Sequence, residues 1–329
     1  MALSRILIIK LSSLGDVVQS LPVAAALRRR FPGAQISWLV APASAGVVGI
    51  CRHVDRVIIY APSARPLLEL LAELRSLRPQ VALDIQGLIR TTGLAWLSRA
   101  RWRIGFRSWQ EGGFALCNLR VVPPRTDIHA VDAYLAFARY LGADGGRPDF
   151  GLRVPRWARD HAARLLPDDG GRPAVALLPG TRWDSKKWPA VSFASVARGL
   201  ANVGVRCIVL GGSEDRAAGA AIGAAAGPTA LDLTGRTSLV DSAALLSRCA
   251  LALGNDSGPM HLAAALGVPV IALFGPTDPA RTGPYGAGHI VIQAPVPCLR
   301  CRRHRCAVAC MERLPAQEVL VAARRRLGV

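Results

Sequence analysis

The chain has 329 residues, 51% of them hydrophobic, and its formal net charge at pH 7 is +19. This length accommodates two domains of ordinary size, and the apolar fraction is sufficient for a substantial core. The positive charge comes almost entirely from arginine and favours an anionic partner, which is a nucleic acid, an acidic lipid or a phosphorylated substrate.

Neither a secretory signal nor a membrane span is predicted. The opening apolar run, 6–9, is interrupted by Lys10, and the longest weakly charged segment, 258–276, contains His261 and three prolines. Eight cysteines without an export signal indicate reduced thiols or a bound metal. We therefore expect a cytoplasmic protein.

Strands and helices alternate along the first half of the chain. The predicted strands are 5–10, 35–40, 57–60, 81–85 and 103–106. The predicted helices are 17–30, 66–77, 91–98 and 129–141, and the segments 105–113 and 120–129 are predicted loops. This alternation predicts a doubly wound parallel sheet.

The loop after the first strand carries Ser13, Gly15 and Asp16 at the start of a helix. Its spacing matches neither the dinucleotide-binding glycine fingerprint nor a Walker loop. Asp16 has two alternative roles. As a first-turn residue it stabilises only the helix; as a general base it faces a ligand cleft.

The alternation resumes after a segment, 144–172, whose composition is typical of an inter-domain connection. We expect an N-terminal domain over 1–157, a linker over 158–171 and a C-terminal domain over 172–329, in which 312–329 is a terminal helix. Strands are predicted at 174–178, 206–210, 231–233, 249–253 and 270–274. The expected fold class is α/β, with two doubly wound domains facing a central cleft.

Polar loops follow the strands of this second predicted sheet. Ligands bind beyond the carboxyl ends of the strands in such sheets. The loop 255–258 also begins a helix, whose free N–H groups can hold a phosphate, and 275–278 follows the next strand. Together the loops predict a nucleotide-sugar site; an acidic N-cap beside a tight turn is the alternative. The polar residues are Thr181, Lys186, Glu214, Thr237, Asp256 and Ser257.

Several motifs resemble those of a known family. They are KLSSLGDVVQSLP (10–22), DIQGL (84–88), IHAVD (128–132), PGTRWDSKKWP (179–189), LGGSED (210–215), GNDSGPMHLAAALGVPVIALFGPTDP (254–279) and Cys310-Met311. The chain resembles the ADP-heptose:lipopolysaccharide heptosyltransferases, glycosyltransferase family 9, over essentially its whole length. The DIQGL and IHAVD segments are more similar to heptosyltransferase I, whereas the cysteine-rich tail is more similar to heptosyltransferase II.

The resemblance implies a GT-B fold of two Rossmann-like domains, with the acceptor bound by the first, the donor by the second, and the C-terminal helix packed back on the first. It implies an inverting transfer from ADP-L-glycero-D-manno-heptose to the Kdo-lipid A or inner-core region of lipopolysaccharide, at the cytoplasmic face of an anionic inner membrane. No metal or other cofactor is implied, and the sequence contains no Asp-x-Asp motif. Family members with another sugar or acceptor remain the alternative.

Site roles are also implied by the resemblance. Asp16 matches the general base, and Lys186 would neutralise the ADP leaving group as a second catalytic residue. The implied donor-binding residues are Thr181, Lys186, Glu214, Thr237, Asp256, Ser257, Gly258 and His261, although a packed helix histidine is an alternative for the last. The expected acceptor-binding residues are Ser13, Gly15, Arg65, Gln86, Arg107 and Arg120; a solvated surface position is the alternative for any one arginine.

Four cysteines lie close together near the C-terminus: Cys298, Cys301, Cys306 and Cys310. They could bind a structural zinc ion tetrahedrally, remain reduced, or form a labile disulfide. A nucleic-acid-binding protein is suggested by charge alone, since no recognised module is present, and no nucleic-acid partner is expected.

Overall fold

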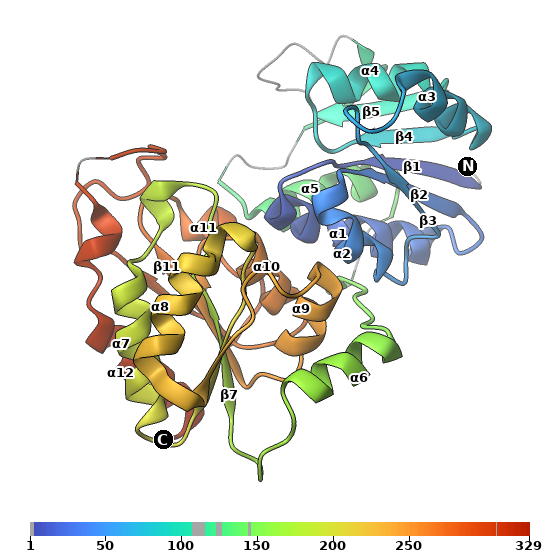
Figure 1. Ribbon diagram of the computed structural model, residues 1–329. Helices are drawn as coiled ribbons and strands as arrows, with labels where there is room; N and C mark the ends of the chain where they lie inside the picture. Colours follow the sequence, from blue (N-terminus) through green and yellow to red (C-terminus); the bar gives the residue numbers. More distant parts are fainter. Residues whose placement is uncertain (1–2, 107–115, 123–126, 144–145, 307) are drawn as a thin grey trace. The chain divides into compact units, whose positions relative to one another are not determined.

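The computed structural model describes residues 3–106, 116–122, 127–143, 146–306 and 308–329 (Figure 1). The chain forms two compact units, Met1–Arg153 and Val154–Val329. Each unit contains a six-stranded sheet in which all pairings are parallel. The α/β fold class predicted from the alternating pattern is confirmed.

The sheet of the first unit has the order β3-β2-β1-β4-β5-β6. Its strands are β1 (Arg5–Ile9), β2 (Gln35–Val40), β3 (Arg56–Ile59), β4 (Val81–Asp84), β5 (Trp102–Phe106) and β6 (Leu119–Val121). The helices described in this unit are α1 (Leu14–Arg30), α2 (Pro42–Gly49), α3 (Leu67–Ser76), α4 (Ile89–Leu97) and, after β6, α5 (Ala130–Tyr140). Strand order reverses between β1 and β4, so the loops after these two strands meet where Rossmann-like sheets bind ligands.

The second sheet repeats this topology, with the order β12-β11-β10-β7-β8-β9. Its strands are β7 (Ala174–Leu178), β8 (Arg206–Val209), β9 (Ala230–Asp232), β10 (Leu251–Asn255), β11 (Val270–Phe274) and β12 (Ile290–Gln293). Its helices are α6 (Arg156–Leu165), α7 (Ala190–Ala201), α8 (Arg216–Ala226), α9 (Leu239–Leu246), α10 (Gly258–Ala265), α11 (Pro279–Thr282) and α12 (Ala316–Leu327). The loops after β7 and β10 therefore meet at the equivalent switch point.

Central strands are buried on both faces, which explains their continuous apolar sequences. All five residues of β7, β10 and β11 are buried. When helices cover both faces of a parallel sheet, the side chains on both faces of a central strand are buried, so apolar and polar residues do not alternate along it. Such strands are recognisable in the sequence, whereas the edge strand β12 and the three-residue β6 were not predicted, and neither was α2.

Both the expected linker and the terminal helix are parts of the second unit. The expected linker, 158–171, contains most of α6, which packs against α9 within the second unit. The terminal helix α12 packs on α7, β10 and β11. Its residues Val319 and Ala323 are fully buried in the core of the second unit. The apolar stripe of this helix therefore completes the core of its own domain, and its expected packing on the first domain stays a prediction.

Candidate active site

The first candidate site lies at the switch point of the N-terminal sheet. Ser13 is the N-cap of α1, and Asp16 is its third helical residue. The Ser13 hydroxyl donates to Asp16 Oδ2 at 2.6 Å, and the Ser13 N–H donates to the same oxygen at 3.1 Å. The Tyr134 hydroxyl donates to Asp16 Oδ1 at 2.9 Å. Asp16 is therefore both a helix-capping residue and a half-buried carboxylate with a fixed orientation.

The electrostatic surroundings favour the ionised form of Asp16. Burial opposes its charge, but the positive charge of Lys10 and the hydrogen bonds from Ser13 and Tyr134 prevail, so its pKa lies below the usual value. An acid with these partners is ionised at neutral pH and can accept a proton. The surroundings of Asp16 therefore allow it to cap the helix and to act as a general base at the same time.

Lys10 and Tyr134 are parts of this site whose roles the sequence did not reveal. Lys10 directly follows β1 and is only 4% exposed. Its ammonium lies 5.0 Å from the centroid of the Tyr134 ring. Burial lowers the pKa of Lys10, against the opposing effects of Asp16 and of Asp84 at the end of β4. The sequence did contain one indication that Lys10 belongs to a site: it is a lysine at the buried end of a central strand. Because burying an unpaired ammonium is costly, such a lysine is expected to have an acidic partner.

Gln86 supports the loop that precedes α1. Its Oε1 accepts hydrogen bonds from the N–H groups of Leu11 and Ser12, both at 3.1 Å. Asp84 in turn fixes the loop around Gln86 by accepting from the Gly87 N–H at 2.9 Å and from the Thr92 hydroxyl at 2.8 Å. The DIQGL segment thus positions the Ser13–Asp16 turn, and Gly15 is buried within its first helical turn.

The arginines that were predicted to bind the acceptor differ in their exposure and in their ion pairs. Arg65 pairs with Glu73 at 2.6 Å, and Glu73 also pairs with Arg56 at 2.7 Å. The guanidinium of Arg65 is therefore already committed to a structural ion pair. Arg120 is exposed on β6, and Arg107 lies outside the described residues.

The second candidate site is built around Asp256, which is 5% exposed just after β10. Lys186 Nζ and the Thr277 hydroxyl each donate to Asp256 Oδ2 at 2.6 Å. His261 Nε2 lies 3.7 Å from Oδ1. Burial opposes ionisation of Asp256, but the neighbouring His261 and the charge of Lys186 lower its pKa to about 2. Three separate loops thereby converge on one carboxylate.

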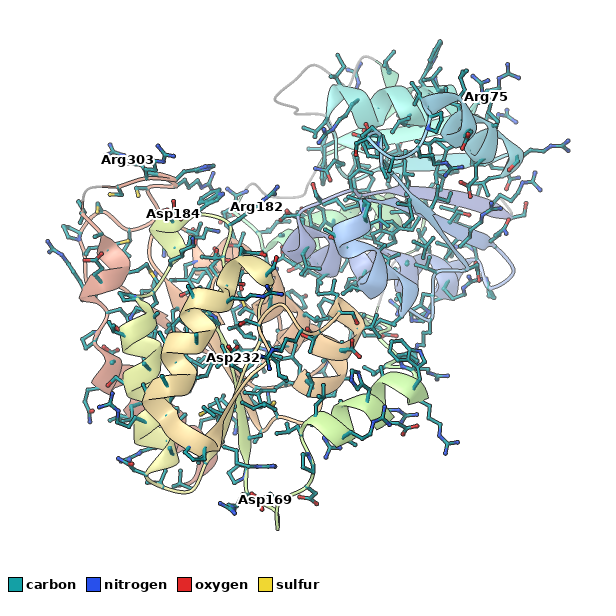
Figure 2. The ribbon with its side chains drawn as sticks, in the orientation of Figure 1. Arg75, Asp169, Arg182, Asp184, Asp232 and Arg303 are labelled. Atoms are coloured by element: carbon teal, nitrogen blue, oxygen red, sulfur yellow. The ribbon has the colours of Figure 1, made fainter. Side chains whose placement is uncertain are left out.

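Lys186 is held by more than this ion pair. It ends a short 3-10 helix, η2 (Asp184–Lys186), in the loop after β7, where Figure 2 labels Arg182 and Asp184. Its ammonium lies 4.3 Å from the centroid of the Trp183 ring. The neighbouring Lys187 instead pairs with exposed Asp184 at 2.8 Å. The two adjacent lysines therefore occupy different environments.

The N-terminus of α10 carries an unsatisfied polar group. Ser257 is the N-cap, and among the described residues its buried hydroxyl has no hydrogen-bond partner. The Thr181 hydroxyl donates to the Asp256 carbonyl beside it at 3.1 Å. A buried hydroxyl, the backbone N–H groups of Gly258 and Met260 in the first turn, and the nearby Lys186 ammonium form the chemistry that binds phosphate.

Asn255 was not predicted, yet it joins the loops of this site. Its amide donates to the Pro179 carbonyl at 2.7 Å, and its Oδ1 accepts from the Trp188 N–H at 3.1 Å. Both ends of the Lys186 loop are thereby tied to β10. Glu214 and Thr237 follow β8 and β9, farther along the same edge; Glu214 is exposed, and the Thr237 hydroxyl lies 3.2 Å from that of Ser242.

The model of glycosyltransferase family 9 (heptosyltransferase) matches residues 68–312. This chain belongs to glycosyltransferase family 9. It is 30% identical over 320 residues to lipopolysaccharide heptosyltransferase 1 of Pseudomonas aeruginosa, covering 92% of this chain and 87% of the relative. It is 26% identical over 298 residues to lipopolysaccharide heptosyltransferase 2 of Escherichia coli, covering 85% of each.

A solved structure of Escherichia coli heptosyltransferase WaaC with ADP is similar to this family 9 chain over 98% of its length and 99% of that chain, with 26% identity and a TM-score of 0.79. The protein is thus a glycosyltransferase with the GT-B fold. The family match includes the Lys186 and Asp256 loops, and the longer match to the Pseudomonas relative spans most of the chain.

The cysteine-rich tail of the glycosyltransferase supports the Lys186 loop. The Ser185 hydroxyl donates to the Arg303 carbonyl at 2.7 Å, and Trp183 stacks on His304 with 3.8 Å between ring centroids. The Arg302 N–H donates to the Pro276 carbonyl at 2.8 Å, next to Thr277. Residues 302–304 therefore hold two loops that converge on Asp256.

The four tail cysteines are free thiols, and Cys310 is buried whereas Cys298 and Cys301 are exposed. Burial raises the pKa of Cys310, and the other three tail thiols add to this effect. Within the described ranges, no three cysteine, histidine or acidic side chains are grouped to bind a metal. A structural zinc ion remains an untested prediction.

Proposed function

We propose that this glycosyltransferase moves a heptose from ADP-L-glycero-D-manno-heptose to the Kdo region of the lipopolysaccharide inner core, with inversion and without a metal cofactor. The main support is the Lys186–Asp256 pair beside the unsatisfied Ser257 hydroxyl at the α10 N-terminus. Relatives of this chain are named lipopolysaccharide heptosyltransferases, and a similar solved structure holds ADP-2-deoxy-2-fluoro heptose.

In the proposed reaction, the α10 N-terminus and Ser257 bind the donor diphosphate, and Lys186 neutralises the charge that develops on departing ADP. Asp16 accepts the proton of the acceptor hydroxyl as that oxygen attacks the anomeric carbon. Asp256 orients Lys186 and contacts the donor sugar. Thr181 assists at the phosphates, and Glu214 and Thr237 lie near the ribose and adenine.

The nearest competing function is transfer to a different inner-core position, as by a heptosyltransferase of the second type. It is favoured by the matching relative of that type and by the cysteine-rich tail. Turnover of ADP-heptose with Kdo-lipid A and with mono-heptosylated acceptor distinguishes the two. The proposal expects higher kcat/KM for Kdo-lipid A; the opposite preference would favour the second type.

We further propose that the protein works at the cytoplasmic face of the inner membrane as a peripheral protein. No helix in the part of the chain that the structure describes is long and apolar enough to span a bilayer. The net charge of +19 favours an anionic lipid surface.

Chelation should leave transferase activity largely intact. In the proposed site, Lys186 supplies the charge that a divalent metal supplies in other transferases. Activity is measured with and without EDTA, followed by addition of individual metals. Complete loss that magnesium or manganese restores would contradict the mechanism, whereas partial loss restored only by zinc would identify the tail cysteines as a structural metal site.

Removal of the Tyr134 hydroxyl should shift the pH profile. The variant Tyr134→Phe removes a hydrogen bond that stabilises ionised Asp16, so the pKa of Asp16 should rise. Since the base must be ionised, the acidic limb of kcat/KM should move to higher pH. Tyr140→Phe, at the exposed end of the same helix, is the control. An unchanged acidic limb in Tyr134→Phe would separate this hydrogen bond from catalysis.

A further inference from the structure

Helices α3 and α4 form one layer on the N-terminal sheet (Figure 1). Their inward sides belong to a single buried cluster, to which α3 contributes Leu70, Leu71 and Leu74, and α4 contributes Leu94 and Ala95. A surface helix normally has one apolar side, which packs on the core, and these buried residues already form that side in α3 and α4. The outward sides of both helices would therefore be expected to be polar.

The outward sides instead carry large apolar side chains. Leu68 is 79% exposed on α3, and Trp96 is 53% exposed on α4. Ile89 is also exposed and precedes Trp96 by seven residues, so both lie on one helical face. Leu67 adds a further exposed apolar side chain at the start of α3. We call this set, with residues 67, 68, 89 and 96, the α3–α4 face.

Basic side chains surround the α3–α4 face. Those exposed on the two helices and the turns that follow them are Arg75, Arg78, Arg90 and Arg99, the first of which Figure 2 labels. None of the four forms an ion pair with another described residue. Of the acidic residues of α3, Glu69 is exposed, while Glu73 is paired with Arg56 and Arg65. The face thus combines exposed leucine and tryptophan with a net positive charge.

We propose that the α3–α4 face is the surface by which this protein docks on an anionic lipid bilayer. Apolar and aromatic side chains bordered by arginine are the chemistry that inserts into the headgroup region of such a bilayer. The inference rests on the proposed function, because the lipid-linked acceptor is what brings the enzyme to a membrane.

The position of the face in the fold supports this assignment. Helices α3 and α4 follow strands β3 and β4, so Leu67, Leu68 and Ile89 lie near the carboxyl edge of the sheet. The turn containing Ser13 and Asp16 follows β1 at the same edge. A bilayer that contacts this edge would bring a lipid-linked sugar to the side of the domain that carries the proposed base.

Vesicle co-sedimentation tests the proposal with the full-length protein. The probes are vesicles of phosphatidylethanolamine and phosphatidylglycerol, with pure phosphatidylcholine for comparison, and no lipopolysaccharide is included. Leu68→Gln/Trp96→Gln should bind anionic vesicles about ten-fold more weakly than wild type. Val191→Gln/Val321→Gln is the matched control, since it removes two exposed apolar residues from the second unit and should leave binding unchanged.

Two further measurements keep the outcome interpretable. Leu68→Gln alone, at the more exposed position, serves if the double variant fails to fold as judged by its melting temperature. Trp96→Phe should remove part of the fluorescence quenching caused by brominated lipids. The proposal is overturned if both double variants bind alike, or if Leu68→Gln/Trp96→Gln abolishes self-association of the protein instead of vesicle binding. Because binding is measured without turnover, failure of the heptosyltransferase assignment would be seen separately.

Discussion

Asp16→Asn is expected to keep the fold and donor affinity while losing about 10²- to 10⁴-fold of turnover, the range typical of a general base. Asparagine preserves the size of the side chain and can still accept a hydrogen bond from the Ser13 N–H, but it is not basic. The measurements are kcat under conditions where chemistry limits the rate, donor affinity, and the melting temperature.

The chain offers a matched control for the capping role of Asp16. Asp241 is the third residue of α9 and accepts from the Ser238 hydroxyl at 2.6 Å and the Ser238 N–H at 3.0 Å, nearly the geometry of Ser13 and Asp16. Asp241→Asn should therefore weaken a helix cap by a similar amount, about 0.5–2 kcal/mol, with near-normal turnover. If Asp16→Asn retained more than about a tenth of wild-type turnover, Asp16 would be a cap alone.

Lys186→Ala should lower turnover by about 10²-fold or more, as expected when a group that stabilises developing charge is removed. Lys187→Ala should have a much smaller effect, because its ammonium pairs with an exposed aspartate rather than with Asp256. The comparison uses kcat and donor KM for both variants, which change neighbouring residues of the same type.

Lys186→Ala also removes the cationic partner of a buried carboxylate. Breaking such a pair typically costs about 3–5 kcal/mol, so the free energy of unfolding must be measured alongside activity. Assays at a temperature where the variant is fully folded separate the two effects. Equal losses of turnover in the two lysine variants, or a larger loss in Lys187→Ala, would contradict the placement of the phosphate contact.

The sequence predicts the α/β fold and the positions of the main polar residues after the central strands, because both depend on local patterns. Short continuous apolar runs such as 174–178 are typical of buried strands, and Asp16, Lys186 and Asp256 lie in the segments that follow β1, β7 and β10. Their chain positions alone place them at the ligand-binding edges of two parallel sheets. The structure then adds that the Lys186 ammonium donates a hydrogen bond directly to the Asp256 carboxylate.

What the sequence could not predict depends on contacts between distant segments. Tyr134 lies 118 residues from the carboxylate to which it donates, and Asn255 ties a loop 67 to 76 residues away. No local pattern marks either residue. Arg65 was expected to bind the acceptor, but its guanidinium is paired with Glu73 two turns along the same segment. The packing of the terminal helix on α7 is a contact of the same kind, since α7 lies more than a hundred residues earlier in the chain.

The most direct test of the central claim is incubation of the purified protein with ADP-L-glycero-D-manno-heptose and Kdo-lipid A in the presence of EDTA, followed by mass spectrometry of the lipid and NMR spectroscopy of the new glycosidic bond. The account predicts release of ADP, a mass gain of one heptosyl residue, and the anomeric configuration opposite to that of the donor. No mass gain with Kdo-lipid A or any heptosylated inner-core acceptor, under conditions where the protein turns over a different nucleotide sugar, would contradict it.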